Sequence, residues 1–309
     1  MAEEPTERTS FIEDDAGKSI EVTVTRRMRI ENNDGEHSLH SVLVIEDFRA
    51  GYYLTIILIH VLGIVLTKVF TKNDYDAIIK SVYGITNNCV YLDFPPSTYI
   101  LPITWCFAII FGFLYSATAM LRIRIAHLEN KLSHREALLL YIAYVYVALS
   151  IVLFTECFAV QPDPEEPVTM VVHTFPYINL KVMSCVLQVV VTYFGVRVSW
   201  TGLKLPRWFS IASVVHAIAY IIDTIFAFVW MVNALGDMGE KSLVGKGLWW
   251  SVRSKGSKVS GQIMVNILGN VLGLVLPLIQ ALFISRNGVN SHALIVAVSD
   301  NRVAAYPGQ

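Results

Sequence analysis

Six long runs of apolar residues, separated by short stretches that hold most of the charge, dominate this sequence. A helix needs about 20 consecutive apolar residues to cross a hydrocarbon core roughly 30 Å thick. Only 16% of the 309 residues are charged, and 54% are apolar. The sequence therefore predicts an all-α membrane protein, a polytopic bundle of about six transmembrane helices. The expected spans cover residues 51–70, 99–121, 137–160, 180–198, 209–235 and 262–284.

The fourth run is the least apolar of the six, because it contains Lys181, Ser184, Gln188 and Thr192. If this segment only dips into the bilayer, the number of spans falls to five. The remaining chain forms two tails under either count. Residues 1–50 are expected to be a soluble N-terminal tail, and residues 285–309 a C-terminal tail.

The charges of the connecting segments bear on orientation. Basic residues should be enriched on the cytoplasmic side, but here they divide almost evenly between the two sides. The segment 122–136 is basic and 161–179 is acidic, which favours cytoplasmic tails, whereas the basic segment 236–261 argues the other way. We expect both tails in the cytoplasm and the protein in the plasma membrane or the endomembrane system.

The four cysteines allow one disulfide in this orientation. Cys89 falls in the first outer loop and Cys157 at the outer end of the third span. Both would face an oxidising compartment, where disulfides form. The sequence thus allows a Cys89–Cys157 disulfide, and four unpaired thiols are the alternative.

The tails contain strand-like patterns. Ile20, Val22 and Val24 alternate with polar residues, the period of two that is typical of a β-strand. The dipeptide Asp34-Gly35 favours a hairpin turn, so residues 39–45 are expected to form the return strand. Residues 293–298 form a third run, and all three are expected to pair in a small sheet. Two disordered tails with chance alternation are the alternative.

Polar residues and glycines form one stripe along the last span. GxxxG pairs such as Gly269 and Gly273 allow two helix backbones to approach closely, and asparagine side chains add hydrogen bonds. The stripe predicts a helix-packing seam, within the bundle or against another membrane protein or a second copy. A polar lining of a path through the bundle is the alternative. Its members are Asn266, Gly269, Asn270, Gly273, Pro277 and Gln280.

A candidate intramembrane polar site lies on the first and fifth spans. His216, Tyr220 and Asp223 share one face of the fifth span, and His60 lies at mid-depth in the first. A charged side chain in a bilayer is costly, so Asp223 should either be neutral or have a partner. The first and fifth spans run in the same direction, so His60 and Asp223 could meet at a similar depth. Such a pair could relay protons or hold a cation, or it could be a structural contact that fixes helix register; alternatively, each group could bond a backbone carbonyl.

Motifs for catalysis and nucleotide binding are absent from the sequence, which contains no GxxxxGK[ST], HExxH, CxxC or GxSxG. It therefore gives no reason to expect an enzyme, a cofactor, a metal site or a nucleic-acid partner; the partner it implies is the lipid bilayer. The first functional hypothesis is an accessory, trafficking or membrane-organising component. The alternative is a small transporter or channel for protons, ions or a small solute, using His60, His216 and Asp223.

Overall fold

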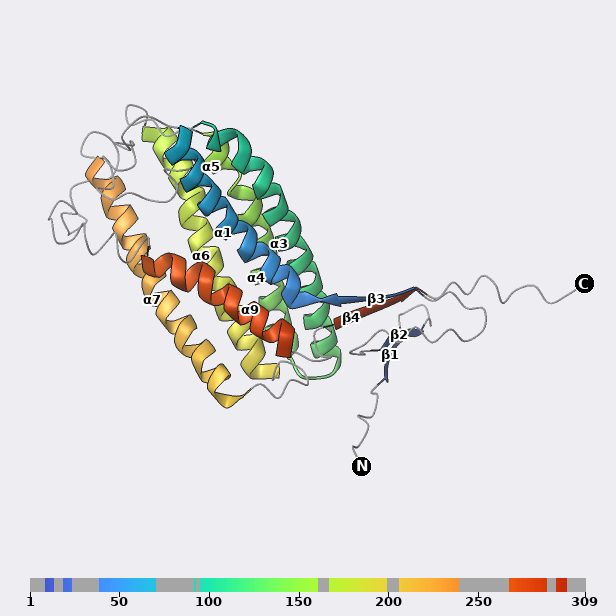
Figure 1. Cartoon of the computed structure of the whole chain (residues 1–309). Helices are drawn as coiled ribbons and strands as arrows, with labels where there is room; N and C mark the ends of the chain where they lie inside the picture. The colour runs from blue at the N-terminus through green and yellow to red at the C-terminus, as the bar shows by residue number, and fades with distance from the viewer. Residues whose placement is uncertain are drawn as a thin grey trace, which may run out of the picture.

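The computed structural model is a bundle of long helices with short strands at one end (Figure 1). The sequence prediction of a helical bundle is confirmed. The structure describes residues 9–13, 19–23, 39–70, 92, 95–160, 167–198, 206–238, 267–287 and 293–298.

Five apolar helical segments are long enough to cross a membrane: Ile45–Phe70, Ser97–Leu128, His134–Ala159, Phe175–Arg197 and Arg207–Val229. The third segment is interrupted by a turn between α4 and α5. These lengths and compositions are compatible with a multi-pass membrane protein. The helices are α1 (Ile45–Phe70), α3 (Ser97–Leu128), α4 (His134–Leu153), α5 (Glu156–Ala159), α6 (Pro167–Val198), α7 (Arg207–Met238), the π-helical η4 (Val271–Val275) and α9 (Leu276–Asn287).

The outward faces of the long helices are apolar. Large side chains on every one of them are exposed, among them Leu54, Ile103, Leu139, Val196 and Ile222. Water would disfavour such a continuous apolar surface, whereas lipid tails would solvate it. The surface therefore agrees with a membrane location.

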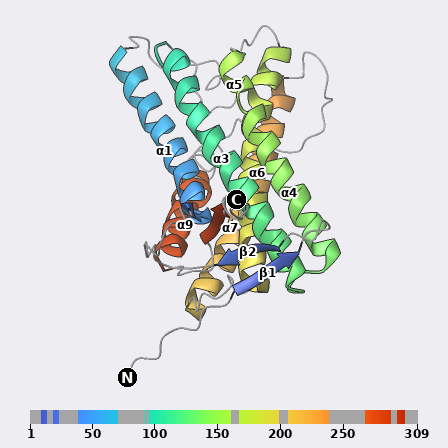
Figure 2. The same cartoon turned by 90° about the vertical axis from the view of Figure 1, so that its right-hand side faces the viewer.

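The helices pack in chain order around the bundle, and the last one closes it. α1 packs on α3, α3 on α4, α4 on α6, and α6 on α7. η4 contacts α1, α6 and α7, while α9 continues along α1 (Figure 2). This arrangement places the middle of the last helix between the first and fifth apolar segments.

The fourth apolar segment is long enough to cross a membrane despite its polar residues. Among the five long candidates, the segment in α6 has the lowest mean hydropathy, but it is 23 residues long. In the part of the chain that the structure describes, the last apolar helix is shorter, Val271–Arg286. The polar side chains of α6 therefore do not shorten that helix, and they need partners inside the bundle.

The strands pair differently from the expected hairpin. β1 (Thr9–Glu13) pairs with β2 (Ser19–Thr23), and β3 (Leu39–Val44) pairs with β4 (Ala293–Val298), both antiparallel. The predicted pairing of residues 20–25 with 39–45 is therefore wrong, and Asp34-Gly35 lies outside the described residues. Because β3 runs directly into α1, its pairing with β4 joins the two tails beside the bundle (Figure 1).

The allowed Cys89–Cys157 disulfide is not formed. Cys89 lies outside the described residues, and no disulfide is present among the cysteines that the structure describes. Cys157 is a buried thiol whose Sγ donates a hydrogen bond to the carbonyl oxygen of His173 at 3.3 Å. The thiol therefore helps to join α5 to the start of α6.

Candidate functional site

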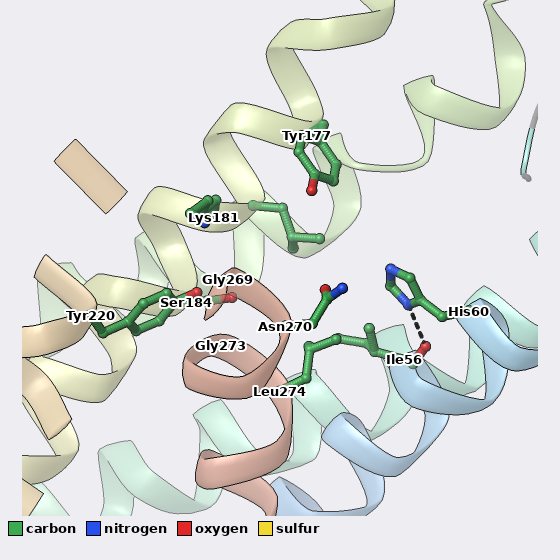
Figure 3. A pocket seen from close by; sticks show the side chains of 11 residues that line it. Ile56, His60, Tyr177, Lys181, Ser184, Tyr220, Gly269, Asn270, Gly273 and Leu274 are labelled. Carbon is green, nitrogen blue, oxygen red and sulfur yellow. Dashed lines mark hydrogen bonds between the residues drawn. The ribbon is translucent and has the colours of Figure 1, made fainter. Parts of the chain in front are cut away.

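A small, partly open cavity with a mixed polar and apolar lining lies where α1, α6, α7 and the last helix meet (Figure 3). Its volume is about 50 Å³. The four helices contribute side chains of mixed character, including an ammonium, an imidazole, an amide and hydroxyls. The lining residues are Ile56, His60, Tyr177, Leu180, Lys181, Ser184, Tyr220, Gly269, Asn270, Gly273 and Leu274.

An ion pair joins α6 to α7 beside this cavity. Lys181 Nζ lies 2.7 Å from Asp223 Oδ2, and the side chains are 10% and 1% exposed. Lys181 belongs to the cavity wall and Asp223 does not. Pairing offsets the cost of removing both charges from water, and loss of one partner would leave the other uncompensated. The ammonium is thus the charged group that the cavity wall presents.

The expected contact between His60 and Asp223 is absent, since Asp223 pairs with Lys181 instead. His60 lines the cavity, and its Nδ1 lies 2.8 Å from the carbonyl oxygen of Ile56 on the same helix. A carbonyl can only accept, so Nδ1 carries the proton of this hydrogen bond. The neutral ring then keeps Nε2 as an acceptor, on the side of the ring away from Ile56 (Figure 3).

His216 and Tyr220 support the cavity from α7. His216 Nε2 lies 2.7 Å from the carbonyl oxygen of Leu272, which bonds α7 to η4. The His216 ring stacks on Tyr220 at a centroid distance of 6.3 Å and an interplanar angle of 9°. Tyr220 is part of the cavity wall, whereas His216 lies behind it. His216 therefore positions Tyr220 and the π-helical segment.

Gly273 permits the close packing of the last helix against Tyr220. A Cβ atom built at Gly273 would lie 2.4 Å from Tyr220 Oη, well inside van der Waals contact. Gly269, Asn270 and Gly273 also line the cavity. The packing seam and the polar lining are alternative predictions for the last span. These three residues lie in the cavity wall, and Gly273 also packs against Tyr220, so both predictions refer to this stretch of the helix.

The other residues of the predicted stripe lie closer to the tails or outside the residues that the structure describes. Pro277 is buried, and Gln280 is only 5% exposed. Gln280 belongs to a separate polar network near the strands. Asn266 lies outside the described residues.

A second buried charged group, which we call the tail-side network, consists of Glu46, Arg49, Arg122, Ser213 and Gln280, each at most 5% exposed. Glu46 Oε2 lies 2.6 Å from Arg49 Nε, and Glu46 Oε1 lies 3.3 Å from Arg122 Nη1. Arg49 Nη1 donates to Gln280 Oε1 at 3.1 Å, and Gln280 Nε2 donates to Ser213 Oγ at 3.0 Å. These bonds join α1, α3, α7 and α9 near the strands.

Aromatic rings surround the tail-side network. The Arg122 guanidinium lies 4.5 Å from the ring centroid of Phe194, within range of a cation–π contact. Tyr115 and Tyr144 are both buried, with their hydroxyl oxygens 3.2 Å apart. The Arg122 guanidinium is therefore packed against an aromatic ring rather than beside the cavity.

Sequence reasoning missed Lys181 as the partner of Asp223, and it missed the tail-side network. Lys181 was visible only as one polar residue in the fourth apolar run. Glu46 and Arg122 lie beyond the ends of the apolar runs, in segments expected to be outside the membrane. The signal available in the sequence was that charged residues on neighbouring helices can pair with one another.

Comparison with known proteins gives no family assignment. No protein-family model matches the chain, and neither a curated protein nor a solved structure matches it.

Proposed function

We propose that this chain is a small transporter or channel that passes an ion or a small polar solute through the cavity between α1, α6, α7 and the last helix. The observation that supports it is the Lys181–Asp223 ion pair, which lies beside the cavity and inside an apolar bundle. Ionisable residues within membrane helices are expensive to bury, and they commonly mark ion or substrate pathways. A purely structural role would not need a cavity beside the charge.

The shape of the last helix adds support. Residues 271–275 form a π-helical turn that contacts α1, α6 and α7. Single π turns inside helices are frequent at functional sites, and transporters often bind their substrates where a helix near the bilayer midplane is irregular. The irregular turn here contributes Gly273 and Leu274 to the cavity wall.

Solute flux through the purified full-length protein in liposomes tests this proposal. The panel should include protons, K⁺, Na⁺, Cl⁻ and acetate, each followed with an ion-selective electrode or a fluorescent reporter. Asp223→Asn removes the charge that holds Lys181, so we expect the flux to fall to about a tenth of the wild-type rate or less. Loss of a buried charged partner changes the free energy by well over the 1.4 kcal/mol that corresponds to a tenfold change in rate.

Glu129→Gln is the matched control. Glu129 pairs with Lys131 at an exposed helix end, and its side chain is 39% exposed. This control makes the same change of carboxylate to amide outside the cavity, so its flux should equal that of the wild type. If the folded wild-type protein passes neither the four inorganic ions nor acetate, the proposal fails, and the accessory or membrane-organising role takes its place.

A further inference from the structure

The charge on the cavity wall has one sign. Lys181 lines the cavity, and its carboxylate partner does not. Asp223 is 1% exposed, so a solute in the cavity meets the ammonium and not the carboxylate. Among the residues of the described cavity wall, Lys181 is the only lysine, arginine, aspartate or glutamate.

The wall also offers hydrogen-bond donors. An ammonium has three N–H groups that can donate hydrogen bonds, and the Lys181 ammonium lies 2.7 Å from Asp223 Oδ2. The hydroxyls of Ser184 and Tyr220 and the amide of Asn270 lie on the same cavity. Donors around a cation are the arrangement that replaces the hydration shell of an anion.

The geometry points to a small monovalent anion as the solute: chloride, or the carboxylate of a short organic acid, bound by the Lys181 ammonium. This inference rests on the proposed function and names the class of substrate for the same site. Asp223 acts as the counter-charge that keeps Lys181 paired when the anion is absent. Lys181 stays paired with Asp223 when the anion binds, because displacing the buried carboxylate would leave it uncompensated.

The size of the cavity limits the choice further. A water molecule needs roughly 10–15 Å³ of such volume, so a cavity of about 50 Å³ holds a few waters. A halide or a carboxylate group fits that space, whereas a lipid headgroup does not. A metal cation is disfavoured because it would have to approach Asp223 past the Lys181 ammonium.

Binding of chloride to the purified full-length protein in detergent tests this inference. The probe is the ³⁵Cl NMR linewidth, which broadens when chloride exchanges with a protein site. We expect the wild type to broaden the line and bromide to reverse the broadening. Acetate distinguishes the two sources of the anion: displacement by acetate as well as bromide indicates a carboxylate site, and displacement by bromide alone indicates a halide site.

Three variants assign the signal to Lys181. Lys181→Gln should weaken chloride binding at least tenfold, since it removes the cation. Asp223→Asn should bind chloride at least as well as the wild type, because it removes only the competing carboxylate. Lys131→Gln, at an exposed lysine, should bind as the wild type does.

The double variant Lys181→Gln/Asp223→Asn guards against misfolding, because it leaves no unpaired charge in the bundle. It should elute as a single species in size exclusion, retain the helical circular dichroism of the wild type and lose the chloride signal. Chloride binding equal to that of the wild type in this folded variant would overturn the inference.

The inference and the proposed function fail in different ways. Chloride binding without flux of any ion would remove the transport role and leave the anion site in place. Flux of K⁺ or protons by a folded wild type that does not bind chloride or acetate would keep the transport role and remove the anion.

Discussion

The bundle buries two groups of charged side chains, and they differ in what surrounds them. The Lys181–Asp223 pair joins two helices and has a cavity on one side. The tail-side network joins four helices, and its arginines are packed against aromatic rings and hydrogen-bonded to Gln280 and Glu46. A buried charge alone is therefore a poor sign of a binding site; empty space beside the charge is the informative feature.

The two groups also differ in charge balance. The mid-bundle pair is neutral, with one ammonium and one carboxylate. Within the described part of the chain, the tail-side network has two guanidiniums and one carboxylate, that of Glu46. Glu46 is therefore the residue on which the tail-side end of the bundle depends most.

The largest expected effect in the tail-side network follows from Glu46→Gln. This change removes the carboxylate that pairs with Arg49 and Arg122, and breaking a buried pair costs about 3–5 kcal/mol. The free energy of unfolding of the full-length protein in detergent micelles, from a denaturant titration, measures the loss. Glu129→Gln at the exposed pair should change the same quantity by only about 0.5 kcal/mol. Equal losses in the two variants would show that the tail-side network does not hold the helices together.

Gln280→Met gives the next largest effect and separates the two regions. The change removes the acceptor of Arg49 Nη1 and the donor to Ser213 Oγ. Leaving buried polar groups unsatisfied costs about 1–3 kcal/mol, which thermal unfolding of the full-length protein in detergent would detect. Chloride binding at Lys181 should be unchanged. A variant that lost chloride binding at undiminished stability would contradict the separation of the two regions.

Gly273→Ala gives the smallest expected loss of stability. The new methyl group would meet Tyr220 Oη, and overpacking of this kind costs about 1–2 kcal/mol when the contacted atom is the tip of a side chain. The double variant Gly273→Ala/Tyr220→Phe removes the clashing hydroxyl and should recover about half of that loss. Unfolding temperatures of the wild type and the two variants give the comparison. No recovery in the double variant would mean that the methyl group clashes elsewhere.

The helical bundle could be predicted from the apolar runs of the sequence, because hydropathy reports the solvent that each helix faces. The need of Asp223 for a buried partner could also be predicted, since a mid-span carboxylate needs one. The helical period likewise shows that Tyr220 shares the face of Asp223. The partner was identified wrongly. Lys181 and Asp223 are equally distant from residue 202, in the short connection between α6 and α7, so an antiparallel pair of helices brings them to the same depth.

Three other features depend on information that local patterns do not contain. α1 begins at Ile45 and α3 ends at Leu128, so both helices extend beyond their apolar runs, and the tail-side network lies on those extensions. Hydropathy marks only the apolar part of a helix. The π-helical turn contacts α1, α6 and α7, which are distant from it in the sequence. The pairing of β3 with β4 joins segments at opposite ends of the chain, and alternation alone does not choose a partner strand.

The β3–β4 pairing has a consequence for how often the chain crosses the bilayer. Strand partners hydrogen-bond only when they are on the same side of a membrane, so Leu39–Val44 and Ala293–Val298 share one compartment. A chain that leaves a compartment and returns to it must cross an even number of times. Among the described residues, the five long helices give an odd number, so we expect the last helix to provide a further crossing. That helix also bounds the cavity, so the expected crossing contains the irregular turn beside Lys181.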